Sequence, residues 1–508
     1  MRVSFYNLIW LYSMYPKRRY FLRSLKDPYN TQKKILFSLL RSNRNTVYGQ
    51  KYSFNSIKTI KDFQSTVPIV SYEDIQHYVD DISNGRPKVL SSQKILFFEE
   101  TSGAGINSKL IPYNRSLLSQ FNFALSSWIW SIYSQYPSIF KGRSYWSISP
   151  PMKSQWDTKA NIQVGIKNDF EYLSLFGRYI SKNIMIQLDS DLYVDSETFY
   201  IETLKKIYSE RHIGLISIWS PTFLFQLDNI LTKNWKQIIP YNSQIDNKST
   251  WSDIFPSIKL VSCWTHGNSA QFMDKLKDIL GDINIEQKGL LSTEGVVSIP
   301  FIKGIDPVLA ITSHFFEFQC QKSQEIFLSH ELNKDYTYEV ILSSGNGILR
   351  YQTGDLIKVT GYIRLTPTMV FIGKKSRISD IVGEKLSETH CVELINKITS
   401  VFKNNGLFIS PFKNVENKYY YALYISGDNF NTNDLISIKN LAVSVLNKNP
   451  YFKQAVSIGQ LDDFRIVNID DITFNNIIDN YFIKYKVKHG DRKPPALFLV
   501  NELDLIKD

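Results

Sequence analysis

Short apolar runs that each end in a loop of small residues recur along the chain from about residue 95. The runs and the loops that follow them are Lys94–Phe98 with Thr101–Ser108, Ile258–Cys263 with Thr265–Ala270, and Lys288–Leu291 with Ser292–Gly295. A run of this kind predicts a strand, and a strand–loop–helix repeat is typical of an α/β fold. The sequence therefore predicts an α/β protein with several small-residue loops at strand ends.

Helices are expected at the start of the chain and antiparallel strands in its middle. The apolar spacing within Thr31–Ser42 is typical of the helical pattern of the first hundred residues. Val3–Tyr15 predicts an amphipathic helix packed on the body, because polar residues interrupt it and no small-residue cleavage site follows it. Tyr338–Leu342 and Ile348–Tyr351 flank a glycine-bearing turn and predict a hairpin.

Length and one glycine-bearing strand indicate more than one domain. A chain of 508 residues allows about two to four domains, and 43% hydrophobic residues are enough for packed cores. Met369–Lys375 is an apolar strand that ends in Gly373 and two lysines. We expect a large domain over residues 1–374 and a smaller one over residues 375–508. Gly373 would be the hinge, although a simple turn explains this glycine equally well.

Charge and cysteine content narrow the function classes. The net charge of +11 favours anionic ligands, but over 508 residues it is too dilute to predict nucleic-acid binding. The three cysteines have no paired spacing, which excludes a disulfide framework and fits a reducing compartment. No apolar run approaches the roughly 18–20 residues that span a bilayer. We therefore expect a cytoplasmic protein without nucleic-acid or membrane contacts.

The loop Thr101–Lys109 has the composition of a phosphate-binding loop. Small residues around Gly103 allow a polyphosphate to approach the backbone, whose successive amides can form an anion-binding nest. The side-chain donors are Thr101, Ser102 and Ser108, with Lys109 as the cation. The loop does not match a Walker motif, so a P-loop NTPase is not supported. An ordinary surface turn could have the same composition, and from this loop alone both interpretations stay open.

Two carboxylates follow strand-like runs. Glu294, within Gly289–Gly295, could hold Mg²⁺ against phosphate oxygens, because Mg²⁺ is bound by one or two carboxylates together with phosphates. Asp355, within Tyr351–Asp355, is an acceptor-only group that suits the two hydroxyls of a ribose. A solvated turn and an Asx turn explain the same two residues.

Other chemistries have less support. The sequence has no HExxH motif and no nucleophile elbow. His314 lies in the apolar run Ser313–Phe318 and is expected to be a hydrogen-bonded core residue. The basic run between Lys484 and Lys493 is expected to be a solvated face rather than a nucleic-acid patch.

In their order along the chain, these loops resemble the motifs of the auxin-responsive Gretchen Hagen family of acyl acid amido synthetases, within the adenylate-forming superfamily. The three nucleotide motifs are Thr101–Pro112, Leu291–Gly295 and Tyr351–Asp355. The supporting stretches, more similar to bacterial than to plant members, are Tyr145–Pro151, Leu215–Leu224, Ser262–Ala270, Ser313–Phe318, Asp380–Leu386 and Gly490–Ala496. The first motif departs from the family pattern, since Ala104, Gly105 and Ile106 replace two hydroxyl residues and a glycine.

The resemblance implies a fold and a nucleotide site. The fold would be α/β, with a large N-terminal adenylate-forming domain of mixed sheets and a β-barrel-like part, followed by a smaller mobile α+β domain. ATP would be bound by the phosphate loop, by the turn Gly267, Asn268 and Ser269 at adenine, and by Tyr351 and Asp355 in the third motif. Glu294 would hold Mg²⁺, Thr293 would contact the α-phosphate, and Lys493 and Lys385 would act in adenylation and in a rotated state.

The resemblance also implies a reaction. A small carboxylic acid would attack the α-phosphate of ATP, giving acyl-AMP and pyrophosphate, and an amine or amino acid would then displace AMP to form an amide. The acid would contact Tyr145, Trp146, Ile148, Trp219 and Phe223, although core packing explains these residues equally well. A thioester-forming ligase, a catalytically impaired relative that binds acyl-adenylate, and a nucleic-acid or membrane binder are the alternatives. We expect a monomer.

Overall fold

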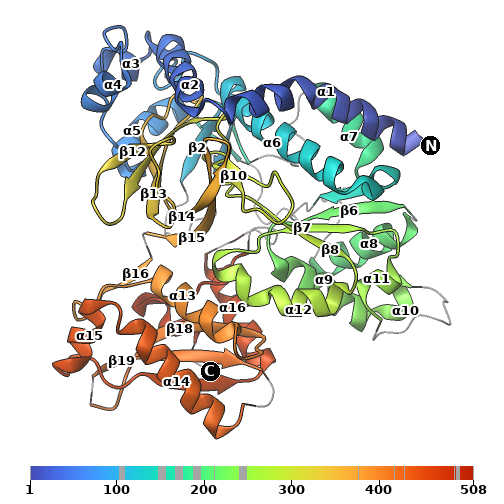
Figure 1. Ribbon diagram of the computed structural model, residues 1–508, viewed down its shortest axis with the longest axis vertical. Coiled ribbons are helices and arrows are strands. Elements are labelled where there is room, and N and C mark those ends of the chain that lie inside the picture. Colours follow the sequence, from blue (N-terminus) through green and yellow to red (C-terminus); the bar gives the residue numbers. More distant parts are fainter. Residues whose placement is uncertain are drawn as a thin grey trace.

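The protein is a mixed α/β molecule with a larger and a smaller body. The computed structural model describes residues 2–101, 109–146, 156–165, 175–186, 196–210, 212–239, 249–375, 377–416, 418–427, 430–485, 487 and 492–506. The chain up to β15 (Thr366–Lys374) forms the larger body, and the chain from β16 (Ile378–Ser379) onward forms the smaller one (Figure 1). This arrangement confirms the predicted fold class.

Helices form the first part of the chain, as its apolar spacing predicts. They are α1 (Arg2–Ser24), α2 (Pro28–Asn43), α3 (Val47–Lys51), α4 (Ile60–Thr66) and α5 (Tyr72–Ser83). Asp27 caps α2, and capping boxes at Thr59 and Ser71 begin α4 and α5. α1 packs against α6 (Arg115–Gln135), where the rings of Trp10 and Tyr133 meet edge to face. The predicted packing of the N-terminal helix is confirmed.

Four parallel strands form the sheet that positions the candidate site. In spatial order they are β3 (Arg143–Trp146), β6 (Ile213–Ser217), β7 (Leu260–Cys263) and β8 (Asn284–Gln287). The helical elements around them are η1 (Pro137–Lys141), α7 (Leu175–Ile184), α8 (Ser196–Ser209), α9 (Pro221–Lys233), α10 (Trp235–Ile238), α11 (Trp251–Ile254), η4 (Gly267–Phe272) and α12 (Met273–Leu280). Because the strands are parallel, their carboxyl ends lie at one edge of the sheet.

Two further sheets complete the larger body. One has the order β2-β1-β5-β4, with β1 (Phe97–Glu100), β2 (Leu110–Tyr113), β4 (Trp156–Asp157) and β5 (Gln163–Val164). The other is antiparallel, with the order β12-β11-β13-β14-β15-β10-β9. Its strands besides β15 are β9 (Ser298–Ile299), β10 (Val308–Leu309), β11 (Phe315–Cys320), β12 (Ile326–Leu328), β13 (Thr337–Ser343) and β14 (Tyr351–Ile363).

The seven-stranded sheet confirms the predicted hairpin. β13 and β14 pair antiparallel, and Gly347 in the connecting turn has a φ of +91°, which favours glycine. The edge strands β12 and β9 do not pair with each other within the described part of the chain, so the sheet is open there.

The predicted strand Lys288–Leu291 is wrong. The strand is β8 (Asn284–Gln287), and after it only an isolated bridge joins Leu291 to Val296. The physical reason is the close approach of Gly289, where a Cβ would lie 1.8 Å from the Ser298 carbonyl oxygen. The chain therefore leaves the parallel sheet and packs against β9.

The smaller body has its own apolar cores, whose buried residues all lie after Lys374. Its elements after β16 are β17 (Leu386–Ser387), α13 (Glu388–Thr399), β18 (Gly406–Lys413), β19 (Tyr419–Ser426), α14 (Thr432–Leu446), α15 (Pro450–Ser457), β20 (Arg465–Ile469), α16 (Asp471–Lys484) and η6 (Val500–Leu505). We propose the domain boundary between Lys374 and Lys375. No helix within the described ranges is both long and apolar enough to cross a membrane.

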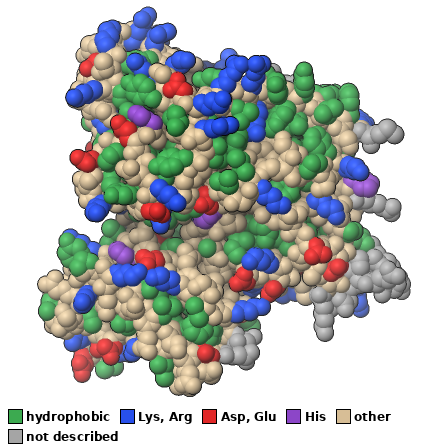
Figure 2. Space-filling model, viewed as in Figure 1, with side chains coloured by type: hydrophobic (Ala, Val, Ile, Leu, Met, Phe, Trp, Pro, Cys, Tyr) green, Lys and Arg blue, Asp and Glu red, His purple; other side chains and the backbone are tan. Residues whose placement is uncertain are grey.

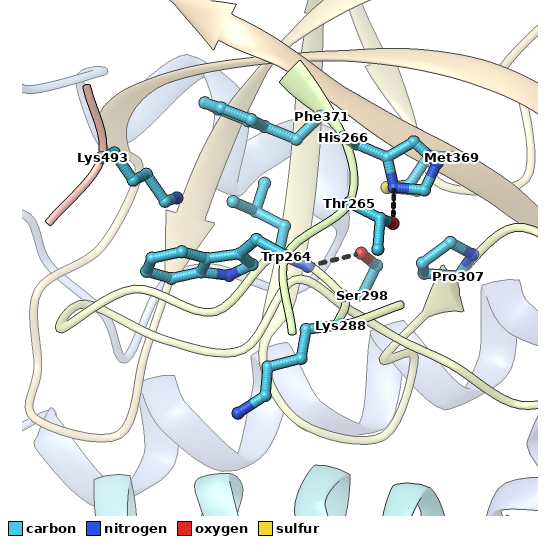
Figure 3. A pocket seen from close by; sticks show the side chains of 11 residues that line it. Trp264, Thr265, His266, Lys288, Ser298, Pro307, Met369, Phe371 and Lys493 are labelled. Atoms are coloured by element: carbon cyan, nitrogen blue, oxygen red, sulfur yellow. Dashed lines mark hydrogen bonds between the residues drawn. The ribbon is translucent and has the colours of Figure 1, made fainter. Parts of the chain in front are cut away.

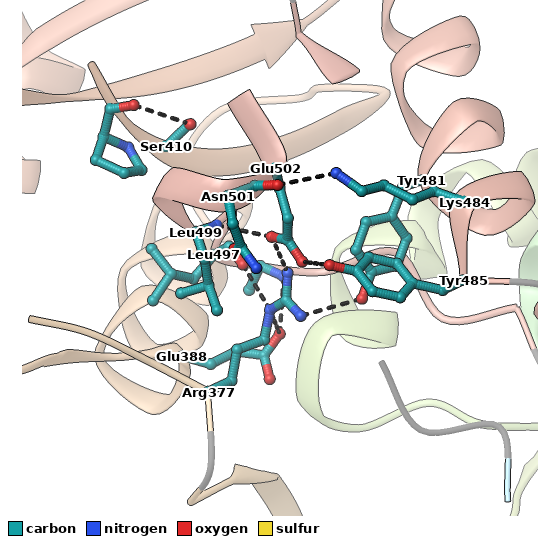
Figure 4. A network of polar contacts seen from close by, with 12 residues as sticks. Arg377, Glu388, Ser410, Tyr481, Lys484, Tyr485, Leu497, Leu499, Asn501 and Glu502 are labelled. Carbon is teal, nitrogen blue, oxygen red and sulfur yellow. Dashed lines mark hydrogen bonds and ion pairs between the residues drawn. The ribbon is translucent and has the colours of Figure 1, made fainter. Parts of the chain in front are cut away.

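A buried polar network joins the two ends of the smaller body (Figure 4). Arg377, just after the boundary, lies 2.6 Å from a carboxylate oxygen of Glu502 in η6 and donates to the Leu497 carbonyl. The Tyr485 hydroxyl donates to the other Glu502 oxygen at 2.7 Å. Burial lowers the pKa of Arg377, but Tyr481 and the carboxylates around it outweigh this effect and raise it. The segment after β15 is thereby fixed to the C-terminal body.

Candidate active site

The carboxyl ends of the parallel strands bring aromatic and basic side chains together. Backbone hydrogen bonds continue the sheet past its strands: the Trp264 amide donates to the Trp219 carbonyl (2.8 Å) and the Lys288 amide to the Cys263 carbonyl (2.9 Å). Trp146 ends the neighbouring strand β3. In open α/β sheets, ligands bind outside the carboxyl ends of the strands. The candidate active site therefore lies at this edge.

A pocket of about 20 Å³ opens at this edge (Figure 3). Its lining residues are Trp264, Thr265, His266, Lys288, Gly289, Leu290, Ser298, Pro307, Met369, Phe371 and Lys493. Lys493 comes from the smaller body, and its Nζ atom lies 3.5 Å from the centroid of the Trp264 ring and 5.2 Å from that of Phe371. Both bodies therefore contribute to the pocket, which as it stands has room for about one water molecule.

Glu294 lies on a tight turn whose backbone is held from two sides. The amides of Ser292 and Gly295 each donate to the carbonyl of the other, at 3.0 and 3.3 Å. The Tyr113 hydroxyl donates to the Thr293 carbonyl. The side chains of Thr293 and Glu294 are only half-buried. The turn therefore holds the backbone at both residues and leaves their side chains accessible to a ligand.

His314 supports this turn from the core. Its ring is fully buried; Nε2 accepts from the Val296 amide (3.1 Å) and Nδ1 lies 3.0 Å from the Gln120 side-chain oxygen. Burial lowers the pKa of His314 to about 3, so the ring is neutral and Nδ1 carries the proton. A Cβ on Gly295 would lie 2.7 Å from Nε2, so the position requires glycine. The predicted core histidine is confirmed, and its support of the Glu294 turn is a contact that sequence reasoning missed.

Asp355 is a buried carboxylate with one unpaired oxygen. The residue is 2% exposed, and its Oδ1 atom lies 2.8 Å from Nζ of Lys374 on the neighbouring strand β15. Its Oδ2 atom is buried and has no hydrogen-bond partner among the described residues. Leaving a buried acceptor without a donor costs about 1–3 kcal/mol. This oxygen therefore suits a hydroxyl donor from a ligand.

The carboxylates of the second and third motifs act on the same neighbouring groups. Burial lowers the pKa of Lys374, but Asp355 and then Glu294 outweigh it, so this pKa is raised. Burial raises the pKa of Tyr351, and Glu294, Glu73 and Asp355 are among the groups that raise it further. Lys374, which sequence reasoning assigned only to the hinge region, therefore belongs to the site.

The first motif begins and ends on the β1–β2 hairpin. The Thr101 amide donates to the Lys109 carbonyl at 2.9 Å and closes the base of the loop. The Lys109 Nζ atom lies 5.5 Å from the centroid of the Tyr72 ring, and Tyr72 and Glu73 act on the pKa of Tyr351. The base of the first motif is thus near the third. Ser102, Gly103 and Ser108, with the departure at Ala104, Gly105 and Ile106, lie outside the described residues.

The turn expected at adenine contacts the C-terminal tail. Gly267, Asn268 and Ser269 form the start of η4, which Trp264, Thr265 and His266 separate from the end of β7. The Asn268 side-chain amide donates to the Pro494 carbonyl, adjacent to Lys493. A Cβ on Gly267 would lie 3.2 Å from the Phe371 ring. This turn therefore borders both the pocket and the smaller body.

The two candidate lysines of the smaller body have different surroundings. Lys493 is half-buried over Trp264, at the pocket. Lys385 is exposed, and its Nζ atom lies 5.0 Å from the Tyr451 ring centroid on α15. Its φ of +46° is unusual for a side chain other than glycine, and the Asn449 side-chain amide donates to its carbonyl at 3.2 Å. In this arrangement only Lys493 of the two lines the pocket.

The residues expected to contact the acid divide between a core and the sheet edge. Tyr145 and Phe223 are 0% exposed and belong to the apolar cluster around α8 and α9. Successive residues of a strand point to opposite faces, so Trp146 points away from Tyr145. Ile148 lies outside the described residues. Of this set, the structure brings Trp146 and Trp219 together near one cation.

That cation is Lys288, which sequence reasoning missed. It is 4% exposed, and its Nζ atom donates to the Ser217 hydroxyl at 3.0 Å. The same atom lies 3.9 Å from the ring centroid of Trp219, 5.4 Å from that of Trp128 and 6.0 Å from that of Trp146. Indole faces attract cations, so the three rings stabilise the buried ammonium.

The described residues fit Mg²⁺ bound largely by a ligand's phosphates. No group of three or more His, Cys, Asp or Glu side chains within the described ranges could hold a metal ion. Mg²⁺ retains waters and needs only one or two carboxylates beside phosphate oxygens. The half-buried carboxylate of Glu294 meets that requirement.

Comparison with known proteins identifies the family. Residues 17–241 match the GH3 family N-terminal domain, and residues 307–374 match the GH3 family central domain. The two matches together cover more than half of the chain. The chain therefore belongs to the GH3 family.

Relatives and solved structures agree with this assignment. The chain is 23% identical to the indole-3-acetic acid-amido synthetase GH3.2 of Arabidopsis thaliana over 75% of this chain and 80% of that protein. It is 21% identical to the 4-substituted benzoates-glutamate ligase GH3.12 of the same organism, over 94% of each. The solved GH3.15 acyl acid amido synthetase has a TM-score of 0.80 at 16% identity, over 96% of this chain and 94% of that one, and shares the fold.

Proposed function

We propose that this protein is an ATP-dependent acyl acid amido synthetase. The acid's carboxylate attacks the α-phosphate of ATP and pyrophosphate leaves; an amine or amino acid then attacks the acyl carbonyl and AMP leaves. Relatives named as an indole-3-acetic acid-amido synthetase and as a 4-substituted benzoates-glutamate ligase support amide formation from an aromatic acid. A monomer in the cytoplasm is part of the proposal, and three free cysteines fit that reducing compartment.

The observation that carries the proposal is the unpaired oxygen of Asp355. A buried carboxylate oxygen without a donor suits a ribose hydroxyl. The other oxygen of Asp355 pairs with Lys374, whose pKa Glu294 also raises. Three motifs that are far apart in sequence thus supply one candidate nucleotide site. The base of the phosphate loop, with Lys109, is the third component.

Positively charged groups at the site are proposed to offset the negative charge of the reactants. A carboxylate must approach a triphosphate, so cations must offset the repulsion between the two anions. Lys493 and Lys109 are proposed to contact phosphates, and Thr293 is proposed to donate to the α-phosphate. Glu294 is proposed to hold Mg²⁺, which would neutralise phosphate charge. Gly267–Ser269 would border adenine.

ATP–pyrophosphate exchange over a panel of carboxylic acids tests the first step. We expect exchange with aromatic acids, followed by amide formation when amino acids are added. Thioester formation with coenzyme A in place of an amide would make the protein a thioester ligase. Absence of exchange with every acid, in a protein that still binds acyl-adenylate, would make it an impaired relative.

Asp355→Ala should raise the KM for ATP about 10- to 100-fold with little change in kcat, because a ribose contact exists in both ground and transition states. Asp335→Ala is the matched control, since Asp335 is an exposed carboxylate paired with Lys358 on the same sheet. Steady-state exchange at varied ATP measures both constants. An unchanged KM for ATP would contradict the ribose assignment.

Lys288→Met should raise the KM for the acid about tenfold or more and leave the KM for ATP unchanged, because methionine keeps the length of the stem and removes the charge. We propose that this buried cation, beside Trp146 and Trp219, binds an acceptor group of the acid. Lys303→Met is the control, since Lys303 is exposed and lies over the ring of Tyr136. Equal increases in both KM values, with a lower melting temperature, would indicate a structural role only.

A further inference from the structure

Helix α1 is apolar on two opposite faces. One face is buried in the larger body through Trp10, Leu11, Met14 and Phe21. The other carries Phe5, Leu8, Tyr12 and Tyr15, which are 61%, 57%, 76% and 47% exposed. These four residues are three or four positions apart and therefore form one stripe along the helix. An exposed apolar stripe of this length is unusual unless another surface covers it.

The net charge of the protein is concentrated in the same part of the chain. Between Arg2 and Thr46 there are ten lysines and arginines and one acidic residue, Asp27, so this segment holds +9 of the net +11. The basic residues with exposed side chains are Arg2, Arg19, Arg23, Lys26, Lys33, Lys34, Arg41 and Arg44. The charge is therefore concentrated in one segment of the chain and not spread evenly over it. The expectation of no membrane contact rested on the lack of an apolar run that could span a bilayer, which does not bear on a protein that lies on its surface.

A basic hollow lies on α2, directly after α1 in the chain. Its volume is about 460 Å³, and it is lined by Asn30, Lys33, Lys34, Phe37, Ser38 and Arg41. Figure 2 shows Lys and Arg side chains gathered where α1 approaches α2, and hydrophobic side chains along the rest of α1. Ammonium and guanidinium groups beside exposed aromatic and aliphatic side chains are the composition of helices that lie in a membrane interface.

We propose that α1 and α2 form a docking surface for an anionic lipid bilayer. The stripe of Phe5, Leu8, Tyr12 and Tyr15 enters the boundary between headgroups and acyl chains, and the basic side chains contact lipid phosphates and carboxylates. The protein lies on the bilayer and does not span it. This contact is independent of the adenylation site and would bring the enzyme to acids dissolved in the membrane.

Charge argues for this partner over two others. A second copy of the same surface would bring two segments of +9 together, and like charges oppose that pairing. A nucleic acid would satisfy the charge but leave the aliphatic part of the stripe in water. An anionic bilayer is complementary to both features.

Vesicle co-flotation of the full chain at about 0.1 M salt tests the proposal, because surface charges are only partly screened there. We expect binding to vesicles of phosphatidylcholine with 30 mol% phosphatidylserine and little binding to pure phosphatidylcholine. Phe5→Ser/Leu8→Ser/Tyr12→Ser should weaken binding about tenfold or more. Arg19→Gln/Arg23→Gln/Lys34→Gln should weaken it about a hundredfold, at about fivefold per charge.

Matched triple variants of the smaller body are the controls. Val415→Ser/Ile436→Ser/Ile472→Ser replaces side chains that are 101%, 53% and 74% exposed, and Lys413→Gln/Lys418→Gln/Lys453→Gln removes three exposed charges. Both should bind like the unmodified chain, and all four variants should keep the unmodified exchange rate. Failure of the unmodified chain to float, or full binding by the apolar variant of α1, would overturn the proposal. Tighter, salt-sensitive binding to RNA than to vesicles would assign the surface to nucleic acid instead.

Discussion

Replacing Glu294 with glutamine should lower the rate of ATP–pyrophosphate exchange about 100- to 1000-fold while leaving the melting temperature unchanged. Glutamine has the shape of glutamate but lacks the charge that would hold Mg²⁺. The turn itself should survive, because its hydrogen bonds come from backbone groups and from Tyr113 rather than from this side chain. The loss should therefore lie in the chemical step and not in folding.

Glu325→Gln is the matched control for this variant, because Glu325 is exposed in the turn between β11 and β12. Exchange rates are measured over a series of Mg²⁺ concentrations for both variants. If Glu294 holds the metal, saturating Mg²⁺ does not restore the rate. A Glu294→Gln protein that exchanges at the normal rate under those conditions would remove Glu294 from the metal site.

The arrangement of the site was partly predictable because sequence patterns report local structure. The apolar run before Trp264 and the glycine-bearing turn at Gly347 have the periodicity and composition of a strand and a hairpin, and both form as expected. The motif around Glu294 was also recognisable, because its small residues are required locally. At Gly295 the buried ring of His314 leaves no room for a side chain.

Long-range pairing explains what the sequence did not reveal. Lys374 follows Gly373 in the chain and therefore looked like part of a hinge. In the structure it lies opposite Asp355, because β14 and β15 pair in that register. A single sequence does not report the register of two strands. Asp355, which pairs with Lys374, and Glu294, which raises its pKa, were thus visible as motifs, whereas the lysine was not.

The surroundings of Lys288 also depend on long-range packing that a single sequence does not report. Trp128 lies on α6, Trp146 ends β3 and Trp219 follows β6, so three distant segments meet around one ammonium group. The run Lys288–Leu291 looked like a strand because its composition is apolar. The close packing of Gly289 against β9 is a tertiary constraint that overrides this local preference.

The hinge at Gly373 stays a prediction, but this glycine lies inside a strand. Gly373 lies within β15, pairs with Leu356 and has a φ of +155°. Proline, with its φ of about −65°, would break this strand. A loss of activity in a proline variant could therefore come from misfolding of the strand as well as from restricted rotation of the smaller body. A Cβ at this position would lie 2.9 Å from Thr389, so alanine is also strained. The two lysines beyond β15 therefore give a cleaner test of two catalytic states.

Lys493→Ala should lower ATP–pyrophosphate exchange about 100- to 1000-fold, yet amide formation from a supplied acyl-adenylate should stay within about threefold. Its ammonium lines the pocket over Trp264, which supports the proposed role of Lys493 in the first half-reaction. Lys385→Ala should do the opposite. Lys385 is exposed and lies over the Tyr451 ring. Its positive φ is a strained conformation, and such strain persists only where surrounding contacts impose it.

Lys453→Ala is the control for both variants. Lys453 is an exposed lysine on α15, and Lys385 is likewise exposed near that helix. Each half-reaction is measured separately on the three proteins. Opposite losses mean that the smaller body presents Lys493 and Lys385 to the site in turn, which requires the contact between Asn268 and Pro494 to open between the two steps. Equal losses of both steps in both lysine variants would mean that one fixed arrangement of the two bodies serves the whole reaction.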